Sequence, residues 1–403
     1  MRTIFLAMLF VLCINGLIQA QEYKIKPGVV ITKENYENYL PELKLSLPHA
    51  VFHRYVNGLK NGWITMPIVK KEYPPLNFFY LEASKQNKGK FKVAENNKLK
   101  GNESWRTGAP FPNPETGDEL AWNIYRRSGY LDDLTFYADF LLYDKKANIE
   151  RSLKWVLRKK MWVGRLEFPP VPEFPGNNGV LNSKECIVIL EPFDVKGFCM
   201  LRIRYEDIEK PDEVYSYIPA IRRIRRLTGS DVTDPMLGSD CVYDDFETWR
   251  QKIDTKMTFN MKKTDKLVGI RVLGDKPEHW KFVRNCYQTE WEVRPFCVLE
   301  VNINDPEYAY SKRVIYANKD AGYTLPYADN YDQRGRLLRV CQNNGQSKLV
   351  FYKGGWYSDC YWGYTYSNSL TGHSTVMVHY PIWRDPGCTE KIFTFKELLK
   401  QAR

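Results

Sequence analysis

The chain has 403 residues, and its 59 Lys and Arg against 48 Asp and Glu give a formal net charge of +11. Hydrophobic residues make up 43% and charged residues 27%, a globular balance that argues against a disordered or fibrous chain. The mean hydropathy of −0.49 argues against a polytopic membrane protein. The high aromatic content of 14% favours β structure.

The N-terminus has the pattern of a secretory signal peptide. A basic start at Arg2 is followed by the apolar run Ile4–Cys13 and by the small residue Ala20. We therefore predict a cleaved signal peptide at 1–20, with an uncleaved anchor helix as the alternative. Export makes nucleic acid an unsuitable partner for the excess positive charge, and an anionic membrane surface fits better.

Eight of the nine cysteines lie beyond the predicted signal peptide, and an exported chain permits disulfides. Cys186 with Cys199, and Cys286 with Cys297, bracket short strand-like stretches, so both pairs are candidates for cross-strand bridges. The alternative is a set of buried free thiols. No CxxC motif occurs, which leaves a zinc ribbon or a thioredoxin-type site without support.

The first third of the chain is expected to be mostly irregular. Residues 32–40 are predicted to form a short helix that Pro41 stops, and residues 45–120 are rich in Pro, Gly, Asn and Lys. Residues 119–127 are then predicted to form a helix with Asp118 as a possible N-cap.

From Leu134 onward the pattern becomes that of β-strands. We predict strands, in chain order, at 136–143, 152–163, 186–190, 198–205, 214–227, 256–261, 267–273, 297–304, 312–318, 337–341 and 374–379, and helices at 244–253 and 395–402. Consecutive strands with short turns imply an antiparallel meander. The fold is thus predicted to be mainly β (α+β), one continuous domain with an elaboration at 21–133 packed on a sheet at 134–403.

No catalytic pattern stands out. The chain has 5 His and lacks HExxH, GxSxG and a phosphate-binding loop, so we expect no enzyme activity, no cofactor and no metal. His49 and His53 are four residues apart and can share a helix face, but no third ligand is near in sequence.

Two charged segments have alternative interpretations. The arginines can form a patch for phosphate or carboxylate groups, or a solvated face paired with acids; they are Arg222, Arg223, Arg225 and Arg226. The acids can bind a hard cation or make ion pairs and helix caps; they are Asp231, Asp234, Asp240, Asp244 and Asp245. In both segments we favour ion pairing.

An aromatic segment lies near the C-terminus: Trp356, Tyr357, Tyr361, Trp362, Tyr364 and Tyr366. Trp362, Tyr364 and Tyr366 alternate, so in a strand they would line one face. Such a stripe can stack on sugars or lie at a lipid interface, but core packing is the more frequent role and is favoured here.

Several segments together resemble one known family. They are residues 29–35, residues 111–117 with 121–123, residues 217–227 with 234–240 and 243–246, and residues 313–316 with 331–335. The chain resembles the exported bacterial family called domain of unknown function 1329, which is similar in its sheet to the outer-membrane lipoprotein-sorting carriers LolA and LolB. The arginine-rich segment with its Gly-Ser-Asp and Tyr-Asp-Asp-Phe runs is the most specific part.

The resemblance implies a strongly curved antiparallel sheet, an incomplete barrel closed by helices around an apolar cavity. It implies a carrier in the periplasm, associated or not with the outer membrane, that binds a lipid, a lipoprotein acyl chain or a sterol-like molecule. A transport partner in the inner or outer membrane and contact with the membrane surface are further expectations. The alternatives are a structural or interaction module without a ligand, and an exported glycan binder or enzyme.

Candidate residues follow from this carrier hypothesis. The proposed lining of the cavity consists of Trp122, Tyr125, Leu190, Tyr217, Ile221 and Phe246. Arg222 and Arg226 are expected to meet an anionic head group at its mouth.

Overall fold

The structure is a computed structural model, and it describes residues 24–70, 78–101, 107–126, 132–228, 234–270, 282–284, 286–343, 346–352, 355–361, 363–379, 383–385 and 387–401. The predicted signal peptide at 1–20 lies outside these residues. Within the described ranges, no helix has the length and apolar character needed to cross a bilayer.

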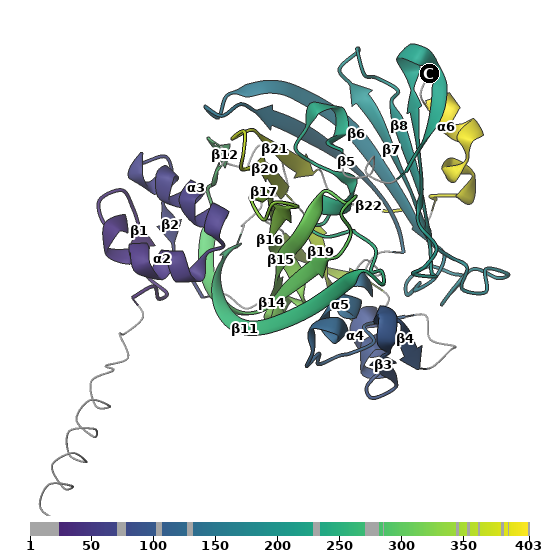
Figure 1. Cartoon of the computed structure of the whole chain (residues 1–403), viewed down its shortest axis with the longest axis horizontal. Coiled ribbons are helices and arrows are strands. Elements are labelled where there is room, and N and C mark those ends of the chain that lie inside the picture. Colours follow the sequence, from purple (N-terminus) through teal and green to yellow (C-terminus); the bar gives the residue numbers. More distant parts are fainter. Residues whose placement is uncertain are drawn as a thin grey trace, which may run out of the picture.

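One large antiparallel sheet of 14 strands dominates the fold (Figure 1). Its strand order is β10-β9-β8-β7-β6-β5-β21-β20-β17-β16-β15-β14-β11, with β22 also pairing with β5. The bounds are β5 (Asp133–Tyr143), β6 (Ile149–Met161), β7 (Leu181–Glu191), β8 (Cys199–Tyr205), β9 (Glu213–Ile218), β10 (Arg223–Leu227), β11 (Met257–Ile270), β14 (Glu290–Ile303), β15 (Tyr310–Asn318), β16 (Thr324–Asp332), β17 (Leu337–Asn343), β20 (Gly363–Asn368), β21 (Ser374–His379) and β22 (Trp383–Arg384). Strands β10 and β11 form the two edges, so the sheet is curved but not closed into a barrel. The predicted mainly β fold is confirmed.

Strand β16 was not predicted, and two of the strand predictions have the wrong connectivity. The strands predicted at 256–261 and 267–273 fall on a single strand, β11 (Met257–Ile270), which pairs with β14 along its whole length, and residues 271–273 lie outside the described residues. The single strand expected at 214–227 is wrong, because β9 and β10 form a hairpin there. Its turn contains the 3-10 turn Pro219–Ile221 and then Arg222, whose φ of 52° reverses the chain.

The helix expected at 244–253 is also wrong. Only the 3-10 turn Tyr243–Asp245 forms in this stretch. Glu247 and Thr248 have φ values of 51° and 76°, which a right-handed helix does not accept. Their neighbours are held instead by side chains of the sheet, as shown below.

The N-terminal region contains more helix than predicted. After the 3-10 turn Tyr36–Tyr39 come α2 (Leu40–Ser46), α3 (His49–Lys60), α4 (Phe78–Lys85) and α5 (Gly117–Arg126). The helix predicted at 32–40 and stopped by Pro41 is wrong: Pro41 lies in the first turn of α2, where a missing N–H costs no helical hydrogen bond. Helix α5 confirms the prediction at 119–127, but its cap is Thr116, whose hydroxyl accepts from the Glu119 amide at 3.3 Å.

The remaining elements are short. They are β1 (Val30–Ile31), β2 (Met66–Pro67), β3 (Phe91–Val93), β4 (Leu99–Gly101), β12 (Phe282–Val283), β13 (Cys286–Tyr287), β18 (Gln346–Tyr352), β19 (Gly355–Tyr361) and the C-terminal helix α6 (Phe395–Gln401). Helix α6 confirms the helix predicted at 395–402.

Alternating side chains divide the interior into cores on the two faces of the sheet. On the inner face, Trp155, Ile187 and Leu299 belong to the largest core, together with α5. On the outer face, α2 and α3 cover the half of the sheet near β11. The other half of the outer face is covered by the C-terminal segment through Cys388 and Phe393 (Figure 1).

Residues 234–256 connect β10 to β11, the two opposite edges of the sheet, and we call them the crossing segment. Because the edges are far apart in the strand order, this segment must traverse a face of the sheet. Its apolar side chains Tyr243, Phe246, Trp249 and Ile253 are all buried in the inner core. The crossing segment and α5 therefore fill the concave side of the half-barrel.

Candidate functional site

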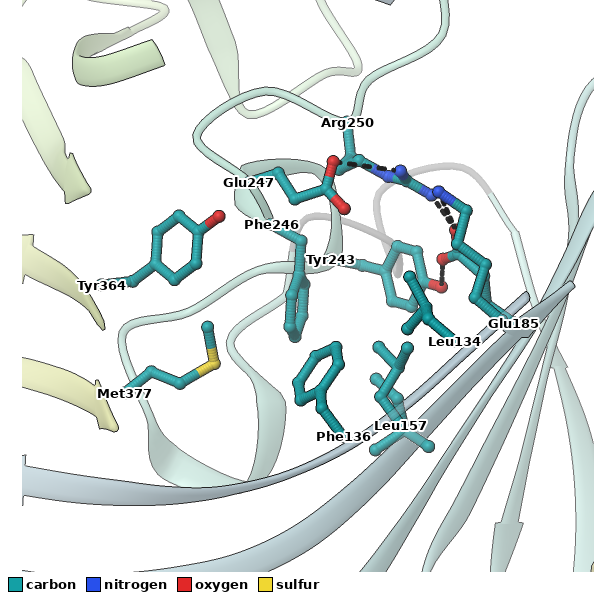
Figure 2. Close-up of a pocket in the computed structure, with 12 residues that line it drawn as sticks. Leu134, Phe136, Leu157, Glu185, Tyr243, Phe246, Glu247, Arg250, Tyr364 and Met377 are labelled. Carbon is teal, nitrogen blue, oxygen red and sulfur yellow. Dashed lines mark hydrogen bonds and ion pairs between the residues drawn. The ribbon is translucent and has the colours of Figure 1, made fainter. Parts of the chain in front are cut away.

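An apolar pocket lies between the crossing segment and the inner face of the sheet (Figure 2). Leu134, Phe136 and Leu157 project into it from β5 and β6. Tyr243 and Phe246 project from the crossing segment on the other side. The alternation of side chains along β5 and β6 places every second residue on this face.

The pocket is narrow. Its empty volume is about 460 Å³ with its opening to solvent included, and the space closed off between side chains holds little more than a water molecule. A second apolar pocket of about 300 Å³ lies on the far side of Phe246, against Trp155 and Met200. Phe246 thus separates two spaces on one face of the sheet, and a chain-like ligand would have to displace its ring.

Charged side chains border the first pocket at one end. Glu185 forms an ion pair with Arg250 and accepts a hydrogen bond from the Tyr243 hydroxyl at 2.5 Å. Arg250 also pairs with Glu247 at 3.2 Å. The pocket is therefore amphipathic, with an apolar wall on the sheet and a compensated charged rim that Glu185 of β7 forms with Glu247 and Arg250 of the crossing segment.

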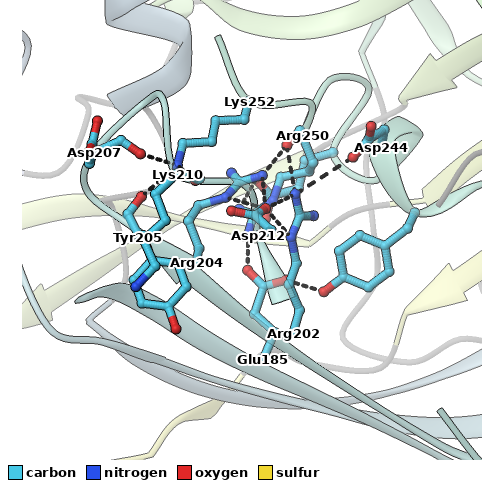
Figure 3. Close-up of polar contacts among 12 residues, drawn as sticks. Glu185, Arg202, Arg204, Tyr205, Asp207, Lys210, Asp212, Asp244, Arg250 and Lys252 are labelled. Carbon is cyan, nitrogen blue, oxygen red and sulfur yellow. Dashed lines mark hydrogen bonds and ion pairs between the residues drawn. The ribbon is translucent and has the colours of Figure 1, made fainter. Parts of the chain in front are cut away.

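The charged rim continues into a buried network at the end of β8 (Figure 3). Burial disfavours the Asp212 carboxylate, but the guanidinium groups of Arg202 and Arg204 outweigh it and hold the pKa of Asp212 at about 2. Burial lowers the pKa of Lys252 to about 8, although its ammonium donates to the carbonyl oxygens of Tyr205 and Lys210. These contacts fix the crossing segment against the β8–β9 hairpin.

A second set of polar contacts anchors the middle of the crossing segment. Asp245 and Arg313 are both fully buried and form an ion pair of 2.6 Å. Tyr310 donates to the same carboxylate at 2.7 Å, and Tyr308 donates to Asp244 at 2.8 Å. The two sequence segments 243–246 and 313–316, which both carry the resemblance to the family, thus meet in one buried cluster.

Three of the five predicted acids make polar contacts, but their partners are not the nearby arginines that were favoured. Asp240 contacts His373 at 2.5 Å, Asp244 lies 3.6 Å from Arg202, and Asp245 pairs with Arg313. Asp231 lies outside the described residues. In the described part of the chain, no group of three His, Cys, Asp or Glu side chains is arranged to hold a metal ion.

Three of the eight predicted ligand residues come together on the inner face. Trp122 and Tyr125 belong to the same core as Phe246, and their rings make an edge contact with centroids 5.6 Å apart. Phe246 lines both apolar pockets, and Tyr125 lines a third pocket next to the first one.

The other five predicted residues lie elsewhere. Leu190 and Tyr217 pack against the core on the outer face. Ile221, Arg222 and Arg226 are exposed on the β9–β10 hairpin, outside the lining of the three pockets. The run of arginines in this segment could not show that β10 is an exposed edge strand.

The predicted cross-strand disulfides are not formed, and all four cysteines are buried free thiols. Cys186 lies opposite Leu201 and Cys199 opposite Val188, so the two are diagonal neighbours at roughly 7 Å. A disulfide needs Cβ atoms about 4 Å apart. Cys286 and Cys297 belong to cores on opposite faces of the sheet.

The aromatic segment contributes to the core, as favoured. Tyr364 and Tyr366 are fully buried and stack with ring centroids 5.9 Å apart, and Tyr364 also lines the first pocket. Trp362 lies outside the described residues.

Sequence reasoning missed most of the pocket wall: Leu134, Phe136, Leu157, Ile187 and Met377. The strands that carry these residues were predicted, so alternation could have placed them on one face. It could not tell that this face is the inner one.

The comparisons with known proteins agree with the resemblance seen in the sequence. The family model described as protein of unknown function (DUF1329) matches residues 30–376. Among proteins of curated function, none matches the chain.

Three solved structures are similar. A DUF1329 family protein from Desulfovibrio piger ATCC 29098 is 18% identical, with 69% of this chain and 97% of that chain covered and a TM-score of 0.48. A domain assigned to outer membrane lipoprotein sorting from Vibrio parahaemolyticus is 22% identical, with coverage of 66% and 91% and a TM-score of 0.46. A LolA superfamily protein from Nitrosomonas europaea is 14% identical, with coverage of 70% and 99% and a TM-score of 0.41.

At such identities and TM-scores, the likeness to these structures says nothing about what this chain binds. The family match is of another kind, because it spans residues 30–376 of the 403. It includes the crossing segment and the buried Asp245–Arg313 pair. The chain therefore belongs to the DUF1329 family of proteins of unknown function.

Proposed function

We propose that this protein is an exported, non-enzymatic carrier that holds a hydrophobic ligand between the crossing segment and the inner face of the sheet. The observation that carries the proposal is the apolar pocket between Phe246 of the crossing segment and Phe136 and Leu157 of the sheet. The ligand classes are a lipid, a lipoprotein acyl chain or a sterol-like molecule. The periplasm is the proposed location.

The free energy gained by burying an alkyl chain is of a size that allows both binding and release. Each methylene group moved from water into an apolar site contributes about 0.8 kcal/mol, so a twelve-carbon chain gains roughly 10 kcal/mol before ordering costs. Because side chains now occupy most of the space, the crossing segment has to shift to admit such a chain. The movement takes up part of the gain and keeps release to a membrane or a transport partner feasible.

One observation favours a second candidate, an interaction module without a ligand. The side chains of the crossing segment leave little enclosed space on the inner face. At the same time, Arg223, Arg225 and Arg226 are exposed on the edge strand β10, where an anionic surface can contact them.

Native mass spectrometry of the protein exported to the periplasm, followed by lipid analysis of an organic extract, separates the two candidates. The carrier predicts a stoichiometric acyl or sterol-like molecule that Phe246→Trp reduces, because the larger indole enlarges the barrier between the two pockets. Leu370→Trp, at an exposed turn, is the matched control. An apo mass that incubation with bacterial lipids leaves unchanged would favour the interaction module.

A further inference from the structure

A third pocket adjoins the apolar one and is polar. Its empty volume is about 240 Å³ with its opening included, and it is lined by Tyr125 and Ile124 of α5 and by Trp249 and Gln251 of the crossing segment. Glu247 and Arg250 line both this pocket and the apolar one. A molecule with a polar end and an apolar tail can therefore occupy the two pockets together.

Two of the residues that line this pocket carry a buried hydrogen-bond donor without a partner. The Tyr125 hydroxyl and the Trp249 indole nitrogen are buried, with only 9% and 4% of these residues exposed, and neither makes a hydrogen bond. Buried donors normally find acceptors, and leaving one unsatisfied is unfavourable. Burial also raises the pKa of Tyr125 to about 12, so the hydroxyl keeps its proton at neutral pH.

The charges in the pocket are already compensated. Arg204 pairs with Asp212 at 3.0 Å, and Arg250 pairs with Glu185 and Glu247. The groups still without a partner are the Tyr125 hydroxyl and the Trp249 indole N–H, and both require a hydrogen-bond acceptor. A carbonyl oxygen meets this need, since its two lone pairs accept two donors.

We propose that the ligand is a single-chain amphiphile whose carbonyl oxygen accepts hydrogen bonds from Tyr125 and Trp249 while its alkyl chain occupies the apolar pocket. This inference rests on the proposed carrier function and names its ligand class. At neutral pH a free fatty acid offers a carboxylate oxygen and an acyl ester a carbonyl oxygen, and both accept hydrogen bonds. The head group is held by α5 and the crossing segment, and the exposed Arg222 and Arg226 have no part in it.

The test measures binding of dodecanoate and of methyl dodecanoate by displacement of the neutral dye N-phenyl-1-naphthylamine. Tyr125→Phe and Trp249→Phe each remove one donor and keep a ring in place. Each is expected to weaken the binding of both dodecyl ligands about 3- to 10-fold, because a hydrogen bond of ordinary strength is lost. The dye, which has no carbonyl, is expected to bind within 2-fold of the wild type.

Tyr215→Phe is the matched control, because its hydroxyl donates to Glu213 on the exposed β9–β10 hairpin and lines none of the pockets. Tyr125→Phe deletes only an unpartnered hydroxyl, so its melting temperature is expected to equal or exceed that of the wild type. Weakening of dodecanoate alone would assign the ligand to free acids, and weakening of the ester as well would extend it to acyl esters.

Two results would overturn the inference, one by refuting the head-group pocket alone and the other by refuting the carrier function. Unchanged affinity for both dodecyl ligands in Tyr125→Phe and Trp249→Phe, with the wild type binding dye and ligands, would refute the head-group pocket and leave the carrier intact. A wild-type protein that binds neither dye nor dodecyl ligands would refute the carrier itself.

Discussion

The sheet is covered on both faces, and the two covers are held in different ways. On the outer face, α3 packs chiefly through the apolar side chains of Val51, Tyr55 and Leu59. On the inner face, the crossing segment is held by buried ion pairs such as Asp245–Arg313, and the three pockets all lie against it. Directional polar contacts fix a segment without requiring its apolar side chains to interlock, and small pockets remain beside these side chains.

The largest effect on the free energy of unfolding is expected at the Asp245–Arg313 pair, which anchors the crossing segment on the inner face. Arg313→Met leaves the fully buried Asp245 carboxylate without its cation, and breaking such a pair costs about 3–5 kcal/mol. Urea unfolding measures this loss. Arg336→Met is the control, because Arg336 pairs with Asp332 at 2.8 Å with half of its side chain exposed, and such pairs contribute less than about 1 kcal/mol. Equal losses in the two variants would contradict the anchoring role.

A smaller effect on stability is expected at the buried carboxyl group of Asp329 in β16. Burial raises the pKa of Asp329 to about 7, against opposing effects of Lys266 and a hydrogen bond from Tyr316. The folded protein therefore keeps this proton between about pH 4 and 7 while the unfolded chain releases it, so the free energy of unfolding falls as pH rises through this window. Asp329→Asn removes this titrating group, so the free energy of unfolding should no longer fall with pH. At pH 7 the substitution should stabilise the protein by on the order of 3 kcal/mol.

Unfolding in urea at pH 4 and at pH 7 checks this prediction, because the two proteins should be alike at the lower pH. Asp265→Asn, at an exposed position of β11, is the control. A stability gain of Asp329→Asn that is the same at both pH values would show that titration is not its cause.

The smallest effect on stability is expected at Gly58, where a substitution tests how tightly α3 packs on the outer face of the sheet. In α3, a Cβ at Gly58 would lie 2.9 Å from Ile64 Cγ1 and 3.3 Å from Cys286 Sγ. Gly58→Ala gains about 1 kcal/mol of helix propensity but loses about 1–3 kcal/mol through overpacking, so a net loss of about 1 kcal/mol is expected. Asn57→Ala on the exposed side of α3 should be neutral or slightly stabilising in the same thermal melts. A gain in stability in Gly58→Ala would contradict tight packing of α3 against Ile64 and Cys286.

Much of the sheet could be predicted, and much of the pocket could not. Strands such as β5, β6 and β21 follow from alternation and turn residues within ten or so positions. The helix expected at 244–253 failed because Asp244 and Asp245 take their partners from β15 and its preceding loop, more than 60 residues away. Of the predicted ligand residues, those on α5 and the crossing segment lie on the inner face, while the arginines of β10 lie on an exposed edge.

The sequence by itself determined the β-rich meander, the turns and the family, because these depend on local conformational preference and on short motifs. Only the tertiary structure decided that β10 and β11 are opposite edges of the sheet and that the chain between them crosses the inner face. The tertiary structure brings Asp245 against Arg313 and places Tyr125 and Trp249 in the lining of one pocket. No local pattern encodes such contacts, because each depends on how the whole sheet curves.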